Sequence, residues 1–281
     1  NLSCPLCPVG AGTLRRPPAQ LALPLYRRFL AELDGALERL LLYNYGEPFL
    51  HPHLLDMIAL AHESEVYTRI STNGLLLDRA GLADDLIASG LDYLRVSVDG
   101  VTQAAYSAYR VGGDLDRVLG GVRLLQERKR SLGRRKPIVE LQVIAMAHNE
   151  HEIPRLRELA QSWGTRLRIK SVGLGRGEDR EARRGWLPAD ESLRRYDGRG
   201  GRLELATVGP ARVCDHPWQR LVVNSDGSVV PCCYDPHGEC TLGQAAEGIL
   251  TVWNGAPIRA LRRALKRDIA PAICRRCSVR L

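Results

Sequence analysis

Short apolar segments that alternate with amphipathic ones restrict this chain to a small set of folds. Each apolar segment is bounded by glycine, proline or polar residues, which is typical of a buried strand. The segments between them carry apolar residues three and four positions apart, which indicates helices. Strands joined by helices in this repeated order pair in parallel, through right-handed crossovers. The predicted strands are 40–45, 66–71, 94–98, 138–145 and 167–172, and the predicted helices are 23–39, 54–61, 78–89, 103–109, 115–132 and 151–163.

This alternation predicts an α/β fold. One further strand is expected before Asn1, which makes about six in total, fewer than the eight of a closed barrel. We therefore expect a partial (β/α)6 barrel of parallel strands. Functional groups in such folds gather at the carboxyl ends of the strands, which is where this chain places its polar, glycine-containing turns.

Composition divides the chain into three regions. Residues 1–172 hold the predicted barrel, and residues 173–209, which are polar and rich in arginine and glycine, are expected to be a linker. Residues 210–281 form a small region that contains six of the eight cysteines. In that region the sequence predicts a β-hairpin with strands 221–224 and 228–230, and a helix at 257–266.

The cysteines are clustered, and the long stretch between Cys7 and Cys214 contains none. Because the first residues carry no export signal, we expect a cytoplasmic protein whose reduced thiols serve a metal rather than disulfides. Taken alone, Cys4 and Cys7 with two residues between them fit a thiol redox pair, half of a zinc site, or the end of a longer cluster motif that begins before Asn1.

The charge excludes some classes of partner. The formal net charge of +8 could attract an anionic partner, yet the basic residues recur as scattered pairs, which is typical of a solvated surface. No nucleic-acid motif accompanies them, so we expect no nucleic-acid partner. No apolar run approaches the length that crosses a bilayer, and no membrane association is expected.

The cysteine pair and the strand ends together resemble the radical S-adenosylmethionine (SAM) superfamily. Cys4 and Cys7 resemble the second and third cysteines of its C-x3-C-x2-C loop, whose three thiolates bind a 4Fe-4S cluster and leave one iron open for SAM. The first cysteine of the loop is then expected immediately before Asn1. The resemblance implies two metal ligands here, Cys4 and Cys7.

Four landmarks after the cysteines carry the same resemblance. Tyr45-Gly46-Glu47-Pro48 resembles the Gly-Gly-Glu-Pro motif that meets the amino group of SAM, with tyrosine in place of the first glycine. Two further turns, 71–74 and 97–100, resemble the strand ends that face the ribose and methionine of SAM, and Arg110 resembles an arginine near the SAM carboxylate. The implied cofactor-binding residues are Gly46, Glu47, Thr72, Asn73, Ser97, Asp99 and Arg110.

The small region resembles the SPASM or Twitch extension of this superfamily. The matching motifs are 214–218, 226–233, 242–243, 252–255 and the final C-x2-C. The resemblance implies one auxiliary 4Fe-4S cluster, because four matching thiolates saturate one cluster and the cysteines of a second auxiliary cluster are lacking. These implied ligands are Cys214, Cys232, Cys274 and Cys277.

Cys233 is left over by this assignment. Adjacent residues of an extended segment point in opposite directions, so Cys233 is expected to face away from the cluster that Cys232 holds. There it could return a hydrogen atom to a substrate radical, as radical epimerases do, which makes it the candidate catalytic residue. The alternative is a small buried apolar side chain.

The resemblance implies an enzyme that cleaves SAM to a 5′-deoxyadenosyl radical and abstracts a hydrogen atom from its substrate. We expect an isomerase acting on a carbinol carbon of a sugar or aminoglycoside in antibiotic biosynthesis, most simply an epimerase that uses Cys233. A dehydrogenase that oxidises an aminocyclitol through the auxiliary cluster and a maturase of ribosomal peptides are alternatives. A reducing partner such as flavodoxin or ferredoxin is expected. A hypothesis of another class is a zinc-stabilised binding module.

Overall fold

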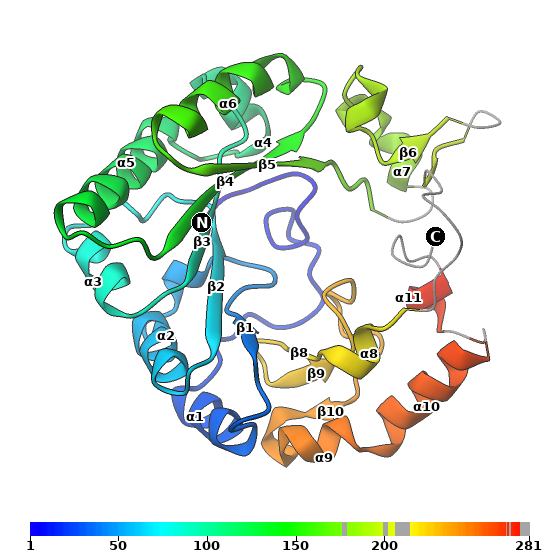
Figure 1. The fold of residues 1–281 in the computed structure, drawn as a ribbon. Helices are drawn as coiled ribbons and strands as arrows, with labels where there is room; N and C mark the ends of the chain where they lie inside the picture. Colours follow the sequence, from blue (N-terminus) through cyan, green and yellow to red (C-terminus); the bar gives the residue numbers. More distant parts are fainter. Residues whose placement is uncertain (176–178, 199–201, 206–213, 268, 270, 276–281) are drawn as a thin grey trace. The chain divides into compact units, whose positions relative to one another are not determined.

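The computed structural model describes residues 1–175, 179–198, 202–205, 214–267, 269 and 271–275 (Figure 1). By its internal contacts the chain divides into two units. The first contains Asn1–Gly12 and Glu38–Glu204, and the second contains Thr13–Leu37 and Leu205–Leu281. No described helix is both long and apolar enough to cross a membrane.

The first unit is built on a five-stranded parallel sheet with the strand order β1-β2-β3-β4-β5. The predicted α/β class, with parallel strands and a separate small sheet, is confirmed. The sixth predicted strand falls before Asn1. The strands are β1 Arg39–Leu41, β2 Tyr67–Thr72, β3 Tyr93–Ser97, β4 Ile138–Ala145 and β5 Arg166–Ser171.

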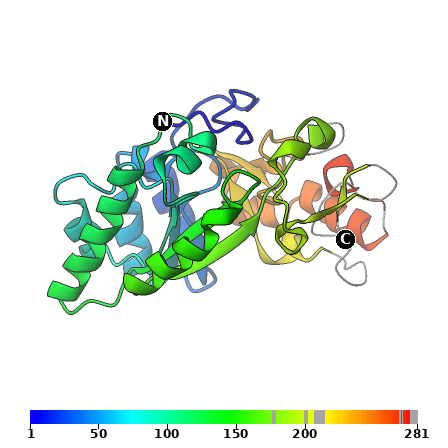
Figure 2. The same ribbon diagram turned by 90° about the horizontal axis from the view of Figure 1, so that it is seen from above.

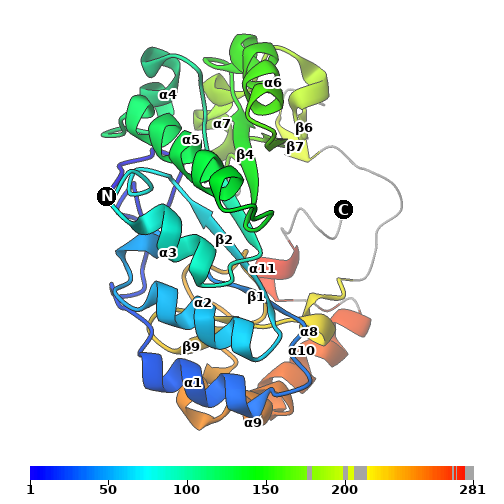
Figure 3. The same ribbon diagram turned by 60° about the vertical axis from the view of Figure 1, so that its left-hand side comes forward.

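Helices connect the strands and cover one face of the sheet. Figures 1 and 3 show α2, α3 and α5 side by side along it, and α6 packs on β5. Their apolar faces meet the strands in one core that includes Ile58, Leu86, Leu94, Val118 and Leu141. The elements after each strand are η1 Pro48–Leu50, α2 Leu54–Glu63, α3 Leu82–Ala88, α4 Gln103–Tyr109, α5 Leu115–Ser131, η2 Glu150–Glu152, α6 Ile153–Ser162, α7 Asp179–Ala182, η3 Arg184–Trp186, η4 Glu191–Leu193, β6 Tyr196–Asp197 and β7 Glu204–Leu205.

The second unit contains α1 and a three-stranded antiparallel sheet with the order β10-β9-β8. The predicted hairpin is present as β8 and β9, and its turn needs Gly227, whose φ is +81°. The Asp226 carboxylate accepts hydrogen bonds from the backbone and the hydroxyl of Ser228 in the same turn. The elements are α1 Leu23–Glu32, α8 His216–Gln219, β8 Val222–Val223, β9 Ser228–Val230, β10 Gly243–Gln244, η6 Ala245–Glu247, α9 Ile249–Trp253, α10 Ala256–Lys266 and α11 Ala272–Arg275.

The unit boundaries differ from the predicted regions at two places. Residues 13–37, predicted to belong to the barrel, group with the second unit because Glu32 caps α9, accepting hydrogen bonds from the amides of Ile249 and Leu250 at 2.8 Å. The described part of the predicted linker up to Glu204 groups with the first unit. There Leu174 donates its amide proton to the Tyr196 hydroxyl, at 2.9 Å.

Three predicted element boundaries are wrong, for local reasons. The helix predicted at 23–39 ends at Glu32, and the turn after it contains Gly35 at a φ of +69°. The helix predicted from 78 begins at Leu82, because Gly81 has a φ of +80°. The strand predicted at 40–45 is shorter and spans Arg39–Leu41.

Buried charges cross-link the sheet. The Glu140 carboxylate on β4 accepts hydrogen bonds from Arg95 Nε and from the Tyr93 hydroxyl on β3, the latter at 2.6 Å, and Arg69 Nη2 on β2 lies 3.3 Å away. Burial alone would raise the pKa of Glu140, but these hydrogen bonds and the two guanidinium groups hold it below its ordinary value. Glu140 therefore contributes stability at neutral pH, which is lost as the pH falls through its lowered pKa.

We expect Glu140→Gln to lower the free energy of unfolding by about 3 kcal/mol, because it leaves the buried Arg95 and the half-buried Arg69 without their counter-charge. Urea unfolding of the iron-loaded protein at neutral pH, followed by circular dichroism, measures the change. The control is Glu127→Gln, which breaks an exposed pair with Arg123 on α5. An equal loss in both variants would contradict the structural role of Glu140.

Candidate functional site

Cys4 and Cys7 lie on one tight loop at the start of the first unit. The Cys7 amide donates to the Cys4 carbonyl at 3.1 Å, and the Ala11 amide donates to the Cys7 carbonyl at 2.8 Å. A Cβ atom at Gly10 would lie 2.5 Å from the backbone nitrogen of Cys4, so only glycine allows this closure. The loop presents two thiols from a few residues of backbone, and such a donor set fits an iron-sulfur cluster.

Arg110 links this loop to the end of β3. Its Nη1 lies 3.9 Å from Cys4 Sγ, and its Nε donates to the Asp99 carboxylate. Burial raises the pKa of Cys4, and the Arg110 charge opposes the rise. Asp99 is fully buried and also accepts a hydrogen bond from the Ile144 amide at 2.6 Å. The structure thus brings together three predicted site residues: Cys4, Asp99 and Arg110.

Glu47 joins the segment after β1 to the end of β2. It follows Gly46, whose φ is +99°, a conformation that favours glycine. Glu47 Oε1 accepts from the Thr72 hydroxyl at 2.7 Å, and Oε2 accepts from the Asn73 amide at 2.8 Å. Burial raises the pKa of Glu47, and these hydrogen bonds oppose the rise. A second group of predicted residues, Gly46, Glu47, Thr72 and Asn73, is therefore adjacent, and the carboxylate oxygens retain lone pairs for a cationic ligand.

Ser97 and the N-terminal loop complete this edge of the sheet. Ser97 is buried as the last residue of β3. Asn73 Nδ2 donates to Asn1 Oδ1 at 2.9 Å, and the Ser3 amide donates to the Val111 carbonyl at 3.0 Å. The loop, dark blue in Figure 2, therefore lies beside the carboxyl ends of β2 and β3.

Two buried residues that the sequence analysis missed hold the strand ends in place. Asn149 donates to the carbonyls of Asp99 and Ile144, each at 2.9 Å. Glu152 accepts from the Val101 amide and the Thr102 hydroxyl, each at 2.6 Å. Both follow β4, so a search for polar residues after every strand could have found them.

A hollow lined by His148 and Trp186 was also missed. Ala108, Ala147, Ala182 and Gly185 complete its lining. The Trp186 ring meets His148 edge to face at 5.5 Å between centroids, and burial lowers the pKa of His148. No sequence pattern links these segments, which lie far apart along the chain.

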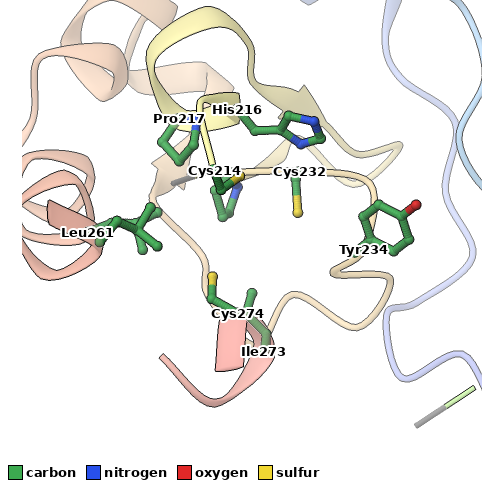
Figure 4. Close-up of a pocket in the computed structure, with 10 residues that line it drawn as sticks. Cys214, His216, Pro217, Cys232, Tyr234, Leu261, Ile273 and Cys274 are labelled. Carbon is green, nitrogen blue, oxygen red and sulfur yellow. The ribbon is translucent and has the colours of Figure 1, made fainter. Parts of the chain in front are cut away.

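Three predicted cluster ligands line a pocket in the second unit. Figure 4 shows Cys214, Cys232 and Cys274 around one space, with Leu261 and Ile273 beside them. Cys277 lies outside the described residues. Cys233, the next residue after Cys232, is exposed and is absent from the described lining of this pocket.

The thiol pocket has donors of the kind that an iron-sulfur cluster takes. Cys214, Cys232 and Cys274 place three thiols around one space. A 4Fe-4S cluster takes each thiolate at a different iron, which spaces its cysteines more widely than tetrahedral zinc does. The apolar lining also fits, because solvent exclusion tunes the reduction potential of such a cluster.

Two models of known protein families match this chain. A model described as the radical SAM superfamily matches residues 1–160, and a SPASM model, described as an iron-sulfur cluster-binding domain, matches residues 214–278.

Similar proteins cover most of the chain. A "PqqA peptide cyclase" of Gluconobacter oxydans is 30% identical over 98% of this chain and 79% of that protein. Another, of Granulibacter bethesdensis, is 28% identical over 99% of this chain and 77% of that protein. A "Pre-heme d1 synthase" of Dinoroseobacter shibae is 30% identical over 74% of this chain and 52% of that protein.

Solved structures share the fold. Streptococcus suis SuiB bound to S-adenosylmethionine has a TM-score of 0.67 at 16% identity, covering 99% of this chain and 69% of that one. BtrN in complex with AdoMet and 2-DOIA has a TM-score of 0.54 at 20% identity, covering 95% of this chain and 82% of that one. The chain therefore belongs to the radical SAM superfamily and carries a SPASM iron-sulfur cluster-binding domain, so its cofactors are SAM and 4Fe-4S clusters.

Proposed function

We propose that this protein crosslinks a peptide by radical SAM chemistry. The observation that carries the proposal is the similarity, over 98% or more of the chain, to two proteins named PqqA peptide cyclase. The relatives lend no support to the predicted sugar or aminoglycoside substrate or to epimerisation, and the likeness to BtrN concerns the fold alone. The zinc-stabilised binding module is not supported either.

The chain's residues have separable roles in this chemistry. Bound together, SAM and its cluster supply a one-electron reductive cleavage that yields a radical able to remove a hydrogen atom from carbon. Cys4 and Cys7 would hold the cluster, and Arg110 keeps a positive charge beside the Cys4 sulfur. Asp99 fixes that guanidinium in place, so the charge needs no reorganisation during the reaction.

Glu47 has two tasks in the proposed site. Its hydrogen bonds from Thr72 and Asn73 fix the end of β2, and its half-buried negative charge would bind the ammonium group of SAM. Thr72, Asn73 and Ser97 present polar groups along the same strand ends. They orient SAM, because positioning supplies much of the rate when the cofactor does the bond breaking.

The thiol pocket could hold the group that takes up an electron from the substrate. Crosslinking two C–H groups removes two hydrogens, of which bound SAM would supply the acceptor for one as a hydrogen atom, and the other would leave as a proton and an electron. Cys214, Cys232 and Cys274, with Cys277, would hold the cluster that takes up this electron. A crosslink needs no returned hydrogen atom, so Cys233 has no catalytic task in this reaction.

The test of the function is incubation of reconstituted protein with SAM, a reductant and either a PqqA-type peptide or a panel of aminoglycosides. We expect 5′-deoxyadenosine and a peptide product lighter by two hydrogens, measured by mass spectrometry. The Cys4→Ala/Cys7→Ala variant is expected to give neither. An aminoglycoside product with an unchanged peptide would contradict the proposal.

For the SAM site, we expect Glu47→Gln to weaken SAM binding about tenfold, because the loss of a charge-assisted hydrogen bond costs roughly 1.5 kcal/mol. Equilibrium dialysis with labelled SAM measures the dissociation constant. The control is Asp78→Asn, which removes a carboxylate that pairs with Arg117 at 2.7 Å. Equal SAM affinity in wild type and Glu47→Gln would leave Glu47 a purely structural role.

For Cys233, we expect Cys233→Ser to form 5′-deoxyadenosine and crosslinked peptide at the wild-type rates, because the exposed thiol is not used. Both products are quantified by liquid chromatography and mass spectrometry. The contrary outcome uses an aminoglycoside: if wild type forms an epimerised product that contains solvent deuterium, and Cys233→Ser forms 5′-deoxyadenosine without that product, Cys233 is a hydrogen donor and the epimerase alternative holds.

A further inference from the structure

Helix α10 has two faces with different partners. Ile258, Leu261 and Leu265 are buried. Leu261 and Leu265 line the thiol pocket together with Cys214, Cys232 and Cys274, and Figure 4 shows Leu261 beside the sulfur atoms. One face of this helix is therefore part of the wall around the proposed auxiliary cluster.

The opposite face is a basic stripe made of Arg259, Arg263, Lys266 and the following Arg267, all of them exposed. The first three recur four and three residues apart and so lie on one side of the helix. The sequence of α10, APIRALRRALK, contains no acidic residue. Within the described part of the chain, no carboxylate forms an ion pair with any of the four.

Arg262, on the same helix, has a structural role. Its Nε donates to the Pro217 carbonyl at 2.9 Å, and its Nη1 donates to the Trp253 carbonyl at 3.1 Å. Its guanidinium also stacks over the Trp253 ring, 4.4 Å from the centroid. Among the described residues, the stripe side chains make no such contact, and like charges at Arg259 and Arg263, four residues apart, repel each other. The stripe therefore presents positive charge to solvent without a counter-charge of its own, which an acidic partner would complement.

We propose that the basic stripe docks a small acidic one-electron carrier, which exchanges an electron with the cluster at the thiol pocket. Because the stripe is positively charged, a partner of complementary charge is acidic. An α-helix with its side chains is only about 10 Å across, so a carrier bound on the stripe lies close to the pocket. During crosslinking, the auxiliary cluster would pass one electron to the carrier, and no atom would be transferred. The docking rests on the proposed function only through the auxiliary cluster, whatever the substrate is.

The test uses the full chain with Cys4→Ala/Cys7→Ala, so that only the auxiliary cluster remains. The cluster is reduced, freed of reductant and mixed anaerobically with an oxidised acidic flavodoxin in a stopped-flow instrument. We expect Arg259→Glu/Arg263→Glu to lower the second-order rate constant about tenfold at low salt and to remove its dependence on salt. Oxidation by neutral 1,4-benzoquinone, which needs no docking, is expected to keep its rate.

The matched control is Arg155→Glu/Arg157→Glu, which makes the same charge change on exposed residues of α6 in the first unit. We expect it to keep the flavodoxin rate. An equal loss in this control, or a wild-type rate in the stripe variant, overturns the docking proposal. The proposal is also overturned if the stripe variant loses affinity for the peptide instead of for flavodoxin. It is overturned as well if the Cys4→Ala/Cys7→Ala protein holds no auxiliary cluster. Failure of the crosslinking assay alone would overturn only the peptide substrate.

Discussion

The buried carboxylate of Asp99 joins three segments that lie far apart in the sequence. One oxygen accepts from Arg110 at the end of α4, and the other accepts from the Ile144 amide on β4. The carbonyl of the same residue accepts from Asn149. A buried charge is tolerable only when it is paired and hydrogen-bonded, and Asp99 meets that condition by fixing the residues around it. The position of Arg110 beside Cys4 follows from this one group.

Carboxylates join strand ends at two further places along the sheet. Glu47 ties the chain after β1 to the end of β2, and Glu152 ties the turn after β3 to the segment after β4. In each case a carboxylate accepts backbone amide protons that the strand ends would otherwise leave without partners. The edge that carries the cofactor-binding candidates is therefore held by side chains whose rotamers are locked, as a site that positions a reactive ligand requires.

Much of the fold could be predicted from local patterns in the sequence. The five parallel strands follow from apolar runs whose period and length suit buried strands, and α4 and β4 have the predicted bounds. The grouping of residues 13–37 with the second unit could not be predicted, because it depends on contacts such as Glu32 with Ile249, which are separated by 217 residues. Motif spacing supplied Cys4, Glu47 and Asp99. It could not supply Asn149 or Glu152, whose partners are backbone groups with no sequence signature, nor the substrate, which the cluster ligands do not specify.

The division of the chain has a consequence for any attempt to separate its parts. The polypeptide passes from the first unit to the second after Gly12, returns at Glu38 and leaves again after Glu204. A fragment cut at Glu204 would keep α1 but lose the residues that α1 packs on, and would expose Tyr26, Phe29 and Leu30 to water. The two units are thus formed by alternating segments of one polypeptide. A single cut in the chain therefore cannot release either unit as an independent domain.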